Sequence, residues 1–203
     1  MLRYGLSEMT DSAGRRRGDK RERLVAGAGD LLHRQGVAGT TLAQVAEASD
    51  VPPGNVYYYF RTKDDLVRAV IEARNGQVRA MLASFETRRS PAARLKALAH
   101  QWVEMRDLVA RYGCPFGTLA SELDRRDDGL DEAAAEPLAA LVDWAQAQFR
   151  LLGRRDAREL AVALISGVQG GAVLANAFRD PDLMSAHVRH LDRWIDSLAQ
   201  DRP

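Results

Sequence analysis

The chain has 203 residues, 46% of them hydrophobic and 28% charged, which is enough apolar material for a sizeable core. No run approaches the roughly 18 consecutive apolar residues of a membrane helix, and the N-terminus lacks the apolar core of a secretion signal. Cys114 is the only cysteine, which excludes an intramolecular disulfide and agrees with a reducing compartment. We therefore expect a cytoplasmic protein without a membrane partner.

Positive charge is concentrated near the N-terminus, although the net charge of the whole chain is only +1. The basic residues there are Arg15, Arg16, Arg17, Lys20, Arg21 and Arg23. Such a cluster is either a solvated, disordered N-terminal segment or an arm that contacts phosphates. The second interpretation requires that a nucleic-acid-binding unit follows it in the chain. We expect residues 1–18 to form a flexible basic arm.

The first expected helix covers residues 19–35, where apolar residues recur at helical spacing. Gly36 follows it as a stop signal. Thr40 or Thr41 then caps a short second helix, because a threonine oxygen can accept from a free backbone N–H of the first turn. The sequence SDVPPG ends this second helix.

A third short helix is expected over residues 53–60, with Pro53 in its first turn, where the missing N–H has no helical partner. This helix carries the three consecutive tyrosines of the chain. Thr62 is the expected cap of a long fourth helix that starts at Lys63.

The rest of the chain also shows helical spacing, and we find no alternating pattern bounded by hairpin turns. The expected helices cover residues 92–111, 118–125, 132–152, 156–178 and 185–198. The short connections between them are typical of antiparallel packed helices. We therefore predict an all-α fold of about nine helices. Its two domains are a reader (residues 19–62) and a helical body (residues 63–203).

The reader has the parts of a helix-turn-helix DNA-binding unit, which places two short helices and a tight turn against a supporting helix. Val56, Tyr59 or Phe60 can bury one face of the third helix. Asn55 can exchange hydrogen bonds with base edges, and Tyr57 or Tyr58 can reach phosphates. Lys63, at the start of the next helix, would anchor a phosphate.

The stretch GVAGTTLAQVAEASDVPPGNVYYYFRTKDDLV resembles the N-terminal reader of the tetracycline-repressor (TetR) family of bacterial transcription regulators. The matching positions are Gly36, Thr40, Thr41, Val45, Ala46, Val51, Gly54, Val56, Tyr57, Tyr59, Phe60 and Lys63. The resemblance implies that Thr41, Asn55, Tyr59 and Lys63 face DNA. Together with the reasoning from the residues, it predicts a DNA-binding set of Thr40, Thr41, Pro53, Asn55, Tyr57, Tyr58, Tyr59 and Lys63. Asp50 and Pro52 depart from the family pattern, which commonly has a glycine and a capping serine there.

Symmetric pairing is expected, because a single reader of this size contacts too few phosphates for strong specific binding. Small residues near position 170 allow two helices to approach closely. Ordinary packing of helices within one chain would use the same rows of small and apolar residues. The resemblance favours a four-helix interface between two copies. The candidate interface residues are Gly167, Gly170, Gly171, Leu174, Leu191, Trp194, Ile195 and Leu198.

The resemblance also implies that the middle helices enclose a cavity for a small-molecule effector. Candidate lining residues are His100, Trp102, Met105, Phe116, Trp144, Phe149 and Gln169. Each taken singly could equally be core, but large aromatic side chains around a hollow bundle are typical of ligand pockets. The set would suit a neutral or weakly polar aromatic or lipid-like compound.

Cys114 follows an arginine-containing helix and is either a thiol sensor of oxidants or electrophiles or a buried, inert thiol. His187 and His190 have helical spacing, but no further ligand stands at matching distance, so we predict no metal and no cofactor. We find no glycine-rich phosphate loop, catalytic carboxylate pair or nucleophile elbow in the sequence, so no motif indicates an enzyme. The sequence thus predicts a dimeric repressor released from operator DNA by an effector. The alternative class is a helical adaptor that does not bind DNA.

Overall fold

A computed structural model describes residues 13–200 of the chain, and the side chains of residues 19–200. This range forms ten α-helices and no strand, which confirms the all-α fold. The helices are α1 (Ala13–Gln35), α2 (Leu42–Ala48), α3 (Pro53–Tyr59), α4 (Lys63–Phe85), α5 (Pro91–Glu104), α6 (Arg106–Tyr112), α7 (Gly117–Leu123), α8 (Leu130–Leu151), α9 (Ala157–Phe178) and α10 (Pro181–Gln200).

The helix bounds differ from the expected ones by up to four residues at α7, α8 and α10, and more at two other places. The single helix predicted over residues 92–111 is two helices, because Met105 takes a non-helical conformation (φ −107°, ψ 16°) between α5 and α6. The apolar spacing continues across this break, so periodicity alone could not reveal it. In addition, α1 begins at Ala13, so residues 13–18 of the expected flexible arm are helical, while residues 1–12 lie outside the described range.

The predicted helix caps of the reader are present. Thr41 caps α2 and Thr62 caps α4, each in a reciprocal capping box with the side chain three residues later. Pro53 occupies the first turn of α3. Gly36 ends α1 at a φ of +76°, a conformation that glycine adopts without steric cost.

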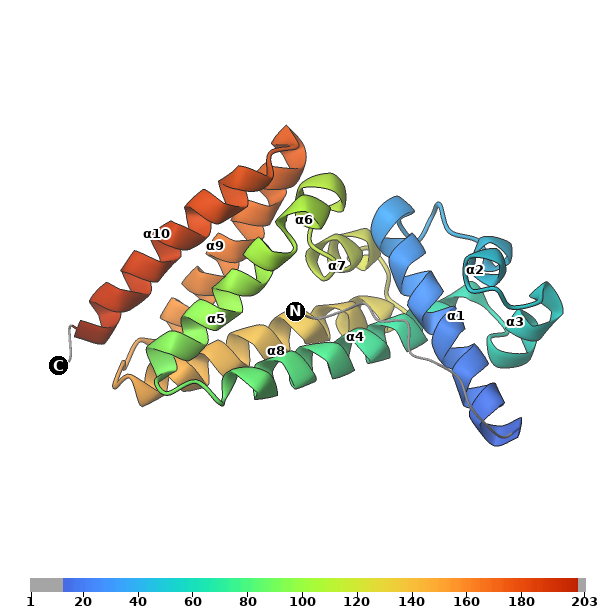
Figure 1. Cartoon of the computed structure of the whole chain (residues 1–203), viewed down its shortest axis with the longest axis horizontal. Helices are drawn as coiled ribbons and strands as arrows, with labels where there is room; N and C mark the ends of the chain where they lie inside the picture. Colours follow the sequence, from blue (N-terminus) through green and yellow to red (C-terminus); the bar gives the residue numbers. More distant parts are fainter. Residues whose placement is uncertain (1–12, 201–203) are drawn as a thin grey trace.

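Two hydrophobic cores share α4, which runs the length of the body (Figure 1). The first core joins α1, α2 and α3 to the N-terminal half of α4. It also takes in Leu119 and Leu123 of α7 and Leu130 of α8. The second core joins the C-terminal half of α4 to α5, α6, α8, α9 and α10. The reader is therefore packed onto the body through α4, α7 and the start of α8.

By length and composition α9 could cross a membrane, and no other helix within residues 13–200 meets that test. In the structure α9 packs against α6, α8 and α10. Its residues Leu164, Val168 and Ala175 are completely shielded from solvent. This is the arrangement of a core helix in a bundle.

Candidate nucleic-acid interface

The tyrosine-bearing helix α3 is anchored on one face and open on the other. Val56 of α3 and Phe60 just after it are buried in the reader core. On the opposite face Tyr57 and Tyr58 are 62% and 68% exposed, although large aromatic side chains usually bury most of their surface. A side chain added at Gly54 would meet nothing within 4 Å, so this turn of α3 is open to an approaching partner.

The remaining exposed positions of the predicted DNA-binding set lie on the same unit. Thr41 and Pro53 are exposed at the starts of α2 and α3, and Asn55 is half-buried. Tyr59 is also half-buried, because its ring packs against the reader core and lies edge-on to Tyr58 with ring centroids 5.1 Å apart. Tyr59 thus supports the exposed ring of Tyr58.

Thr40 does not belong to the exposed set. Its side chain is only 1% exposed, and its hydroxyl donates to the carbonyl oxygen of Gly36 at 2.7 Å. A hydroxyl held in this way stabilises the turn between α1 and α2 and cannot reach a phosphate. The sequence pattern could not separate Thr40 from Thr41, because both are threonines in front of the same helix.

Lys63 contacts the protein itself. Its Nζ donates to the carbonyl oxygens of Val37 at 2.8 Å and Thr40 at 3.2 Å. An ammonium has three N–H donors, so two of them are committed to the turn between α1 and α2. Phosphate binding by Lys63 stays a prediction, and it would have to use the third donor.

The two departures from the family pattern have visible consequences at the turn before α3. Pro52 provides no side-chain cap for this helix. Asp50 adopts a positive φ of 50°, in the region where glycine is common. Arg23 of α1 holds this turn by donating to the carbonyl oxygen of Ser49 and to the carboxylate of Asp50, at 2.6 and 3.2 Å.

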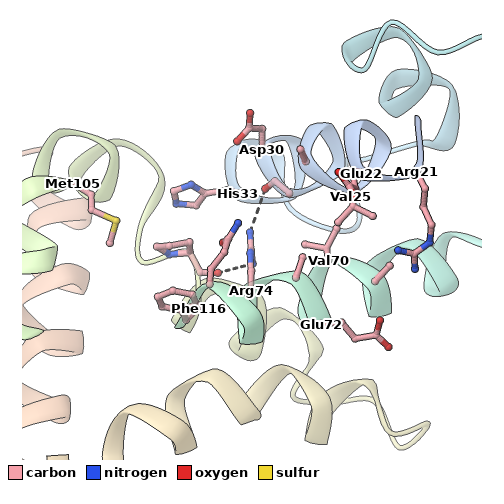
Figure 2. Close-up of a pocket in the computed structure, with 16 residues that line it drawn as sticks. Arg21, Glu22, Val25, Asp30, His33, Val70, Glu72, Arg74, Met105 and Phe116 are labelled. Carbon is pink, nitrogen blue, oxygen red and sulfur yellow. Dashed lines mark hydrogen bonds between the residues drawn. The ribbon is translucent and has the colours of Figure 1, made fainter. Parts of the chain in front are cut away.

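A cavity of about 550 Å³ lies between α1 and α4 at the junction of reader and body (Figure 2). Arg74 of α4 is a buried residue of its lining and donates to the carbonyl oxygens of Gly29 and Pro115 at 3.2 and 2.6 Å. His33 of α1 makes a 2.8 Å hydrogen bond with the carbonyl oxygen of Gly113. Because that partner is a carbonyl, Nε2 of His33 is the donor. Burial is the main reason why the pKa of His33 lies below 6.5.

Comparisons with known proteins agree with this geometry. The family described as "Bacterial regulatory proteins, tetR family" matches residues 24–70, and "Tetracyclin repressor-like, C-terminal domain" matches residues 91–191. The HTH-type transcriptional regulator LmrA of Bacillus subtilis (strain 168) is 30% identical over 169 residues, which are 78% of this chain and 87% of LmrA.

A second relative, the transcriptional regulator AcuR of Cereibacter sphaeroides, is 28% identical over 188 residues, covering 88% of this chain and 86% of AcuR. The crystal structure of a TetR transcriptional regulator from Legionella pneumophila has the same fold, with a TM-score of 0.79 at 19% identity. The match covers 92% of this chain and 98% of that chain. The chain belongs to the tetR family of bacterial regulatory proteins.

In this TetR-family regulator the residues predicted to line an effector cavity are scattered. Met105 and Phe116 border the cavity between α1 and α4. Trp102 and Phe149 are fully buried and fill the core of the body. Gln169 is half-buried on α9, with its amide oxygen close to Gly117 at the start of α7.

Two members of the predicted effector set, His100 and Trp144, do not border the cavity between α1 and α4, and each makes a polar contact elsewhere. His100 is exposed and pairs with Asp192 of α10 at 2.8 Å. The indole N–H of Trp144 donates to the carboxylate of Glu86 at 2.8 Å. Helical spacing predicted that both residues are on α5 or α8, but which neighbour each one meets depends on how the helices pack.

Cys114 is buried in the loop between α6 and α7 and is 4% exposed. Its carbonyl oxygen accepts from the hydroxyl of Thr118 at 2.7 Å, which closes the loop. His187 and His190 stack on α10 with ring centroids 6.4 Å apart. No group of three potential metal ligands occurs among the described residues.

The predicted dimer residues divide between two faces of α9 and α10. Leu191 and Ile195 are buried in the core of the same chain, and Gly167 and Gly171 lie against His187 of α10, so these four make intramolecular contacts. Trp194 and Leu198 are half-buried against the same core. Gly170 faces open space and Leu174 is 51% exposed.

A continuous uncovered face of α9 extends from these two residues. Val162, Val173 and Phe178 are also exposed on it, with exposed fractions of 44%, 66% and 68%. Periodicity missed Val162, Val173 and Phe178 because the helix is apolar on nearly every side. Exposed large hydrophobic side chains in such a group are typical of an interaction surface.

Polar contacts made by α7 and the loop after it, to the turn before α2 and to the start of α4, were also missed by sequence reasoning. Glu122 of α7 accepts hydrogen bonds from the backbone N–H groups of Val37 and Ala38. Arg126 pairs with Asp64 at the start of α4 at 2.6 Å. No local pattern marks residues that contact a segment more than 60 positions away in the sequence.

Proposed function

We propose that this TetR-family regulator is a homodimeric repressor that binds operator DNA through α2 and α3 and is released by a small-molecule effector. The observation that carries the proposal is the exposed face of α3. Its aromatic rings point away from a buried anchor formed by Val56 and Phe60. Residues 19–62 would bind DNA and residues 63–203 would dimerise and bind the effector, in the cytoplasm.

The DNA-contacting residues would be Thr41, Pro53, Asn55, Tyr57 and Tyr58, since each is exposed or half-buried on the reader. Asn55 would read a base edge, and the tyrosine hydroxyls would contact phosphates. Since dimeric helix-turn-helix proteins bind half-sites about one helical turn apart, two such readers would span successive major grooves.

The exposed apolar face of α9 supports the homodimer. Pairing of this face with its copy would remove Val173, Leu174 and Phe178 from water, and each fully buried side chain of this kind contributes about 1.5–3 kcal/mol. Gly170 would let the two helices approach closely, because nothing lies within 4 Å of the position of its missing Cβ atom.

Two buried donors support effector binding in the body. The indole N–H of Trp102 and the amide NH₂ of Gln169 have buried nitrogen atoms without a hydrogen-bond partner among the described residues. An unpaired buried polar group costs about 1–3 kcal/mol. An effector with a carbonyl or hydroxyl acceptor would satisfy such donors, which agrees with a neutral or weakly polar ligand.

DNA binding is tested by selecting duplexes from a random-sequence pool and measuring affinity for the selected duplex at several salt concentrations. A reader pair that neutralises about six phosphates should lose roughly a thousandfold in affinity between about 50 and 200 mM salt. The variant Asn55→Ala should bind the selected duplex more weakly, by about tenfold, because a base contact contributes about 1–3 kcal/mol of discrimination.

Gln77→Ala is the matched control, because Gln77 carries the same amide on an exposed position of α4 in the body. It should bind the selected duplex as tightly as the natural chain does. Binding that is independent of salt, or a pool that yields no preferred sequence, would favour the adaptor that does not bind DNA.

A further inference from the structure

The carboxylate of Glu122 connects the body to the reader. Its two oxygens accept from the backbone N–H of Val37 at 2.8 Å and from that of Ala38 at 2.9 Å. These amides follow the end of α1 and lie in the turn that leads to α2. Hydrogen bonds from backbone N–H groups to an ionised carboxylate are stronger than neutral ones, and two together fix direction as well as distance.

The turn is shaped to receive this carboxylate. Gly36 has a φ of +76°, and a Cβ atom at this position would lie 2.9 Å from an oxygen of Glu122. Every other residue type would therefore be strained and would press on the carboxylate. From the other side Lys63 donates to the carbonyl oxygens of Val37 and Thr40. The N–H groups of the turn are thus held by an anion of α7, and its carbonyl groups by a cation of α4.

The turn sets the position of the DNA-contacting helices. Thr41, the cap of α2, follows it directly, and α3 packs on α2. The start of α7, by contrast, contacts the body. The ring of Phe116 lies edge-on to that of Trp102 with centroids 6.4 Å apart, and Gln169 of α9 lies against Gly117. Figure 1 shows α7 between the body helices and α1.

We propose that Glu122 is a positioning residue for DNA binding, which fixes the reader on the body by holding the turn between α1 and α2. The role rests on the proposed function, since it matters for DNA only if α3 reads operator sequence. If α7 moved, the hydrogen bonds of Glu122 would move the turn before α2, and with it α2 and α3. Loss of the carboxylate would release the turn between α1 and α2 from α7, while the contacts of Leu119 and Leu123 with the reader core remain and keep the reader folded.

The first test is amide hydrogen exchange, measured residue by residue in the full chain without DNA. Glu122→Gln and Glu122→Ala should raise the exchange rates of the Val37 and Ala38 amides at least tenfold, while the body helices α8 and α9 keep their protection. Asp124→Asn is the matched control, because Asp124 is exposed at the end of the same helix. Unchanged exchange at Val37 and Ala38 in both Glu122 variants would overturn the proposal, whatever the protein does on DNA.

The second test separates positioning from folding and from charge. Affinity is measured for a duplex selected by the natural chain and for an unrelated duplex of the same length. Both Glu122 variants should lose about tenfold on the selected duplex and keep their affinity for the unrelated one, because phosphate contacts need no fixed reader position. A parallel loss on both duplexes, or the same loss in Asp124→Asn, would contradict a positioning role. If Glu122→Ala does not fold, the outcome of the test is taken from Glu122→Gln, because glutamine keeps one acceptor oxygen.

Discussion

Asp50 shows how one residue can depart from a family pattern and still occupy the backbone conformation that the pattern requires. Its φ of 50° lies in the left-handed region, which aspartate tolerates better than most side chains but glycine adopts freely. The exposed carboxylate pairs with Arg23 at 3.2 Å, and an ion pair of this kind contributes little. The backbone conformation, and not the charge, is therefore the main constraint at this position.

Asp50→Gly should be more stable than Asp50→Ala by about 1 kcal/mol, because the left-handed conformation costs an alanine roughly 1–2 kcal/mol. Both variants remove the carboxylate, so their difference isolates the backbone effect. Urea unfolding of the two proteins measures the difference in the free energy of unfolding. Equal stabilities would mean that the turn relaxes to a negative φ when the side chain allows it.

Tyr57, Tyr58 and Thr40 mark the limit of sequence reasoning for single residues. The sequence identified a cluster of polar and aromatic residues around the turn of the helix-turn-helix unit. Tyr57 and Tyr58 of this cluster are exposed, as expected. Thr40 was placed with them and is buried. Adjacent threonines have the same chemistry, so only their places in the folded turn distinguish them.

Among the elements, α9 has the face that matters most for assembly. The glycine positions on this helix have different surroundings: Gly167 and Gly171 lie against His187, whereas Gly170 is open. A helix with apolar residues around most of its circumference has one buried side and one available side, and spacing does not say which is which. The core packing of α9 against α8 and α10 leaves Leu174 and its neighbours uncovered.

Leu174→Glu should weaken self-association at least tenfold, because it places a charge in a face that the proposed dimer buries. Sedimentation at several concentrations measures the dissociation constant of the dimer. Leu108→Glu is the matched control: it makes the same substitution at an exposed leucine of α6, away from α9. A dimer that survives Leu174→Glu but is lost in Leu108→Glu would move the interface to α6.

For the whole molecule, the reader and the body are joined more closely than two domains in sequence order suggest. The reader core takes Leu119, Leu123 and Leu130 from a segment that follows it by more than 50 residues. Polar contacts at the same junction include the hydrogen bond of His33 with Gly113 and that of Arg74 with Gly29. Stability of the reader therefore depends on α7 and α8.

This junction should make stability depend on pH through His33. Burial, with the charges of Arg74 and Arg34, lowers the pKa of His33 below 6.5, although Asp30 and the Gly113 carbonyl act in the opposite direction. The unfolded chain then binds a proton more readily than the folded one. The contribution of neutral His33 to the free energy of unfolding is fully present above about pH 6.5. It is lost as the pH falls from there towards the lower pKa that His33 has in the folded state.

His33→Gln should reduce the loss of stability between about pH 7.5 and pH 5.5, because glutamine keeps a donor for the Gly113 carbonyl and does not titrate. Urea unfolding at the two pH values measures the effect. The comparison variant His187→Gln changes another histidine whose pKa is lowered, mainly by burial, but which lies on α10, far along the chain from the junction. If His33→Gln keeps the full pH dependence, His33 is not the titrating group at the junction.

The sequence by itself determined the all-α fold and most of its helices, the caps at Thr41 and Thr62, the position of Pro53 and the resemblance of the reader to its family, but not the break between α5 and α6. These features depend on local chemistry: apolar spacing, a hydroxyl at a helix start, a ring that fixes φ. Only the tertiary structure decided that Thr40 is buried, that Glu122 holds the turn before α2, and which face of α9 remains open. Each of these outcomes depends on contacts between segments far apart in the chain, and no local pattern of residues records which segments will meet.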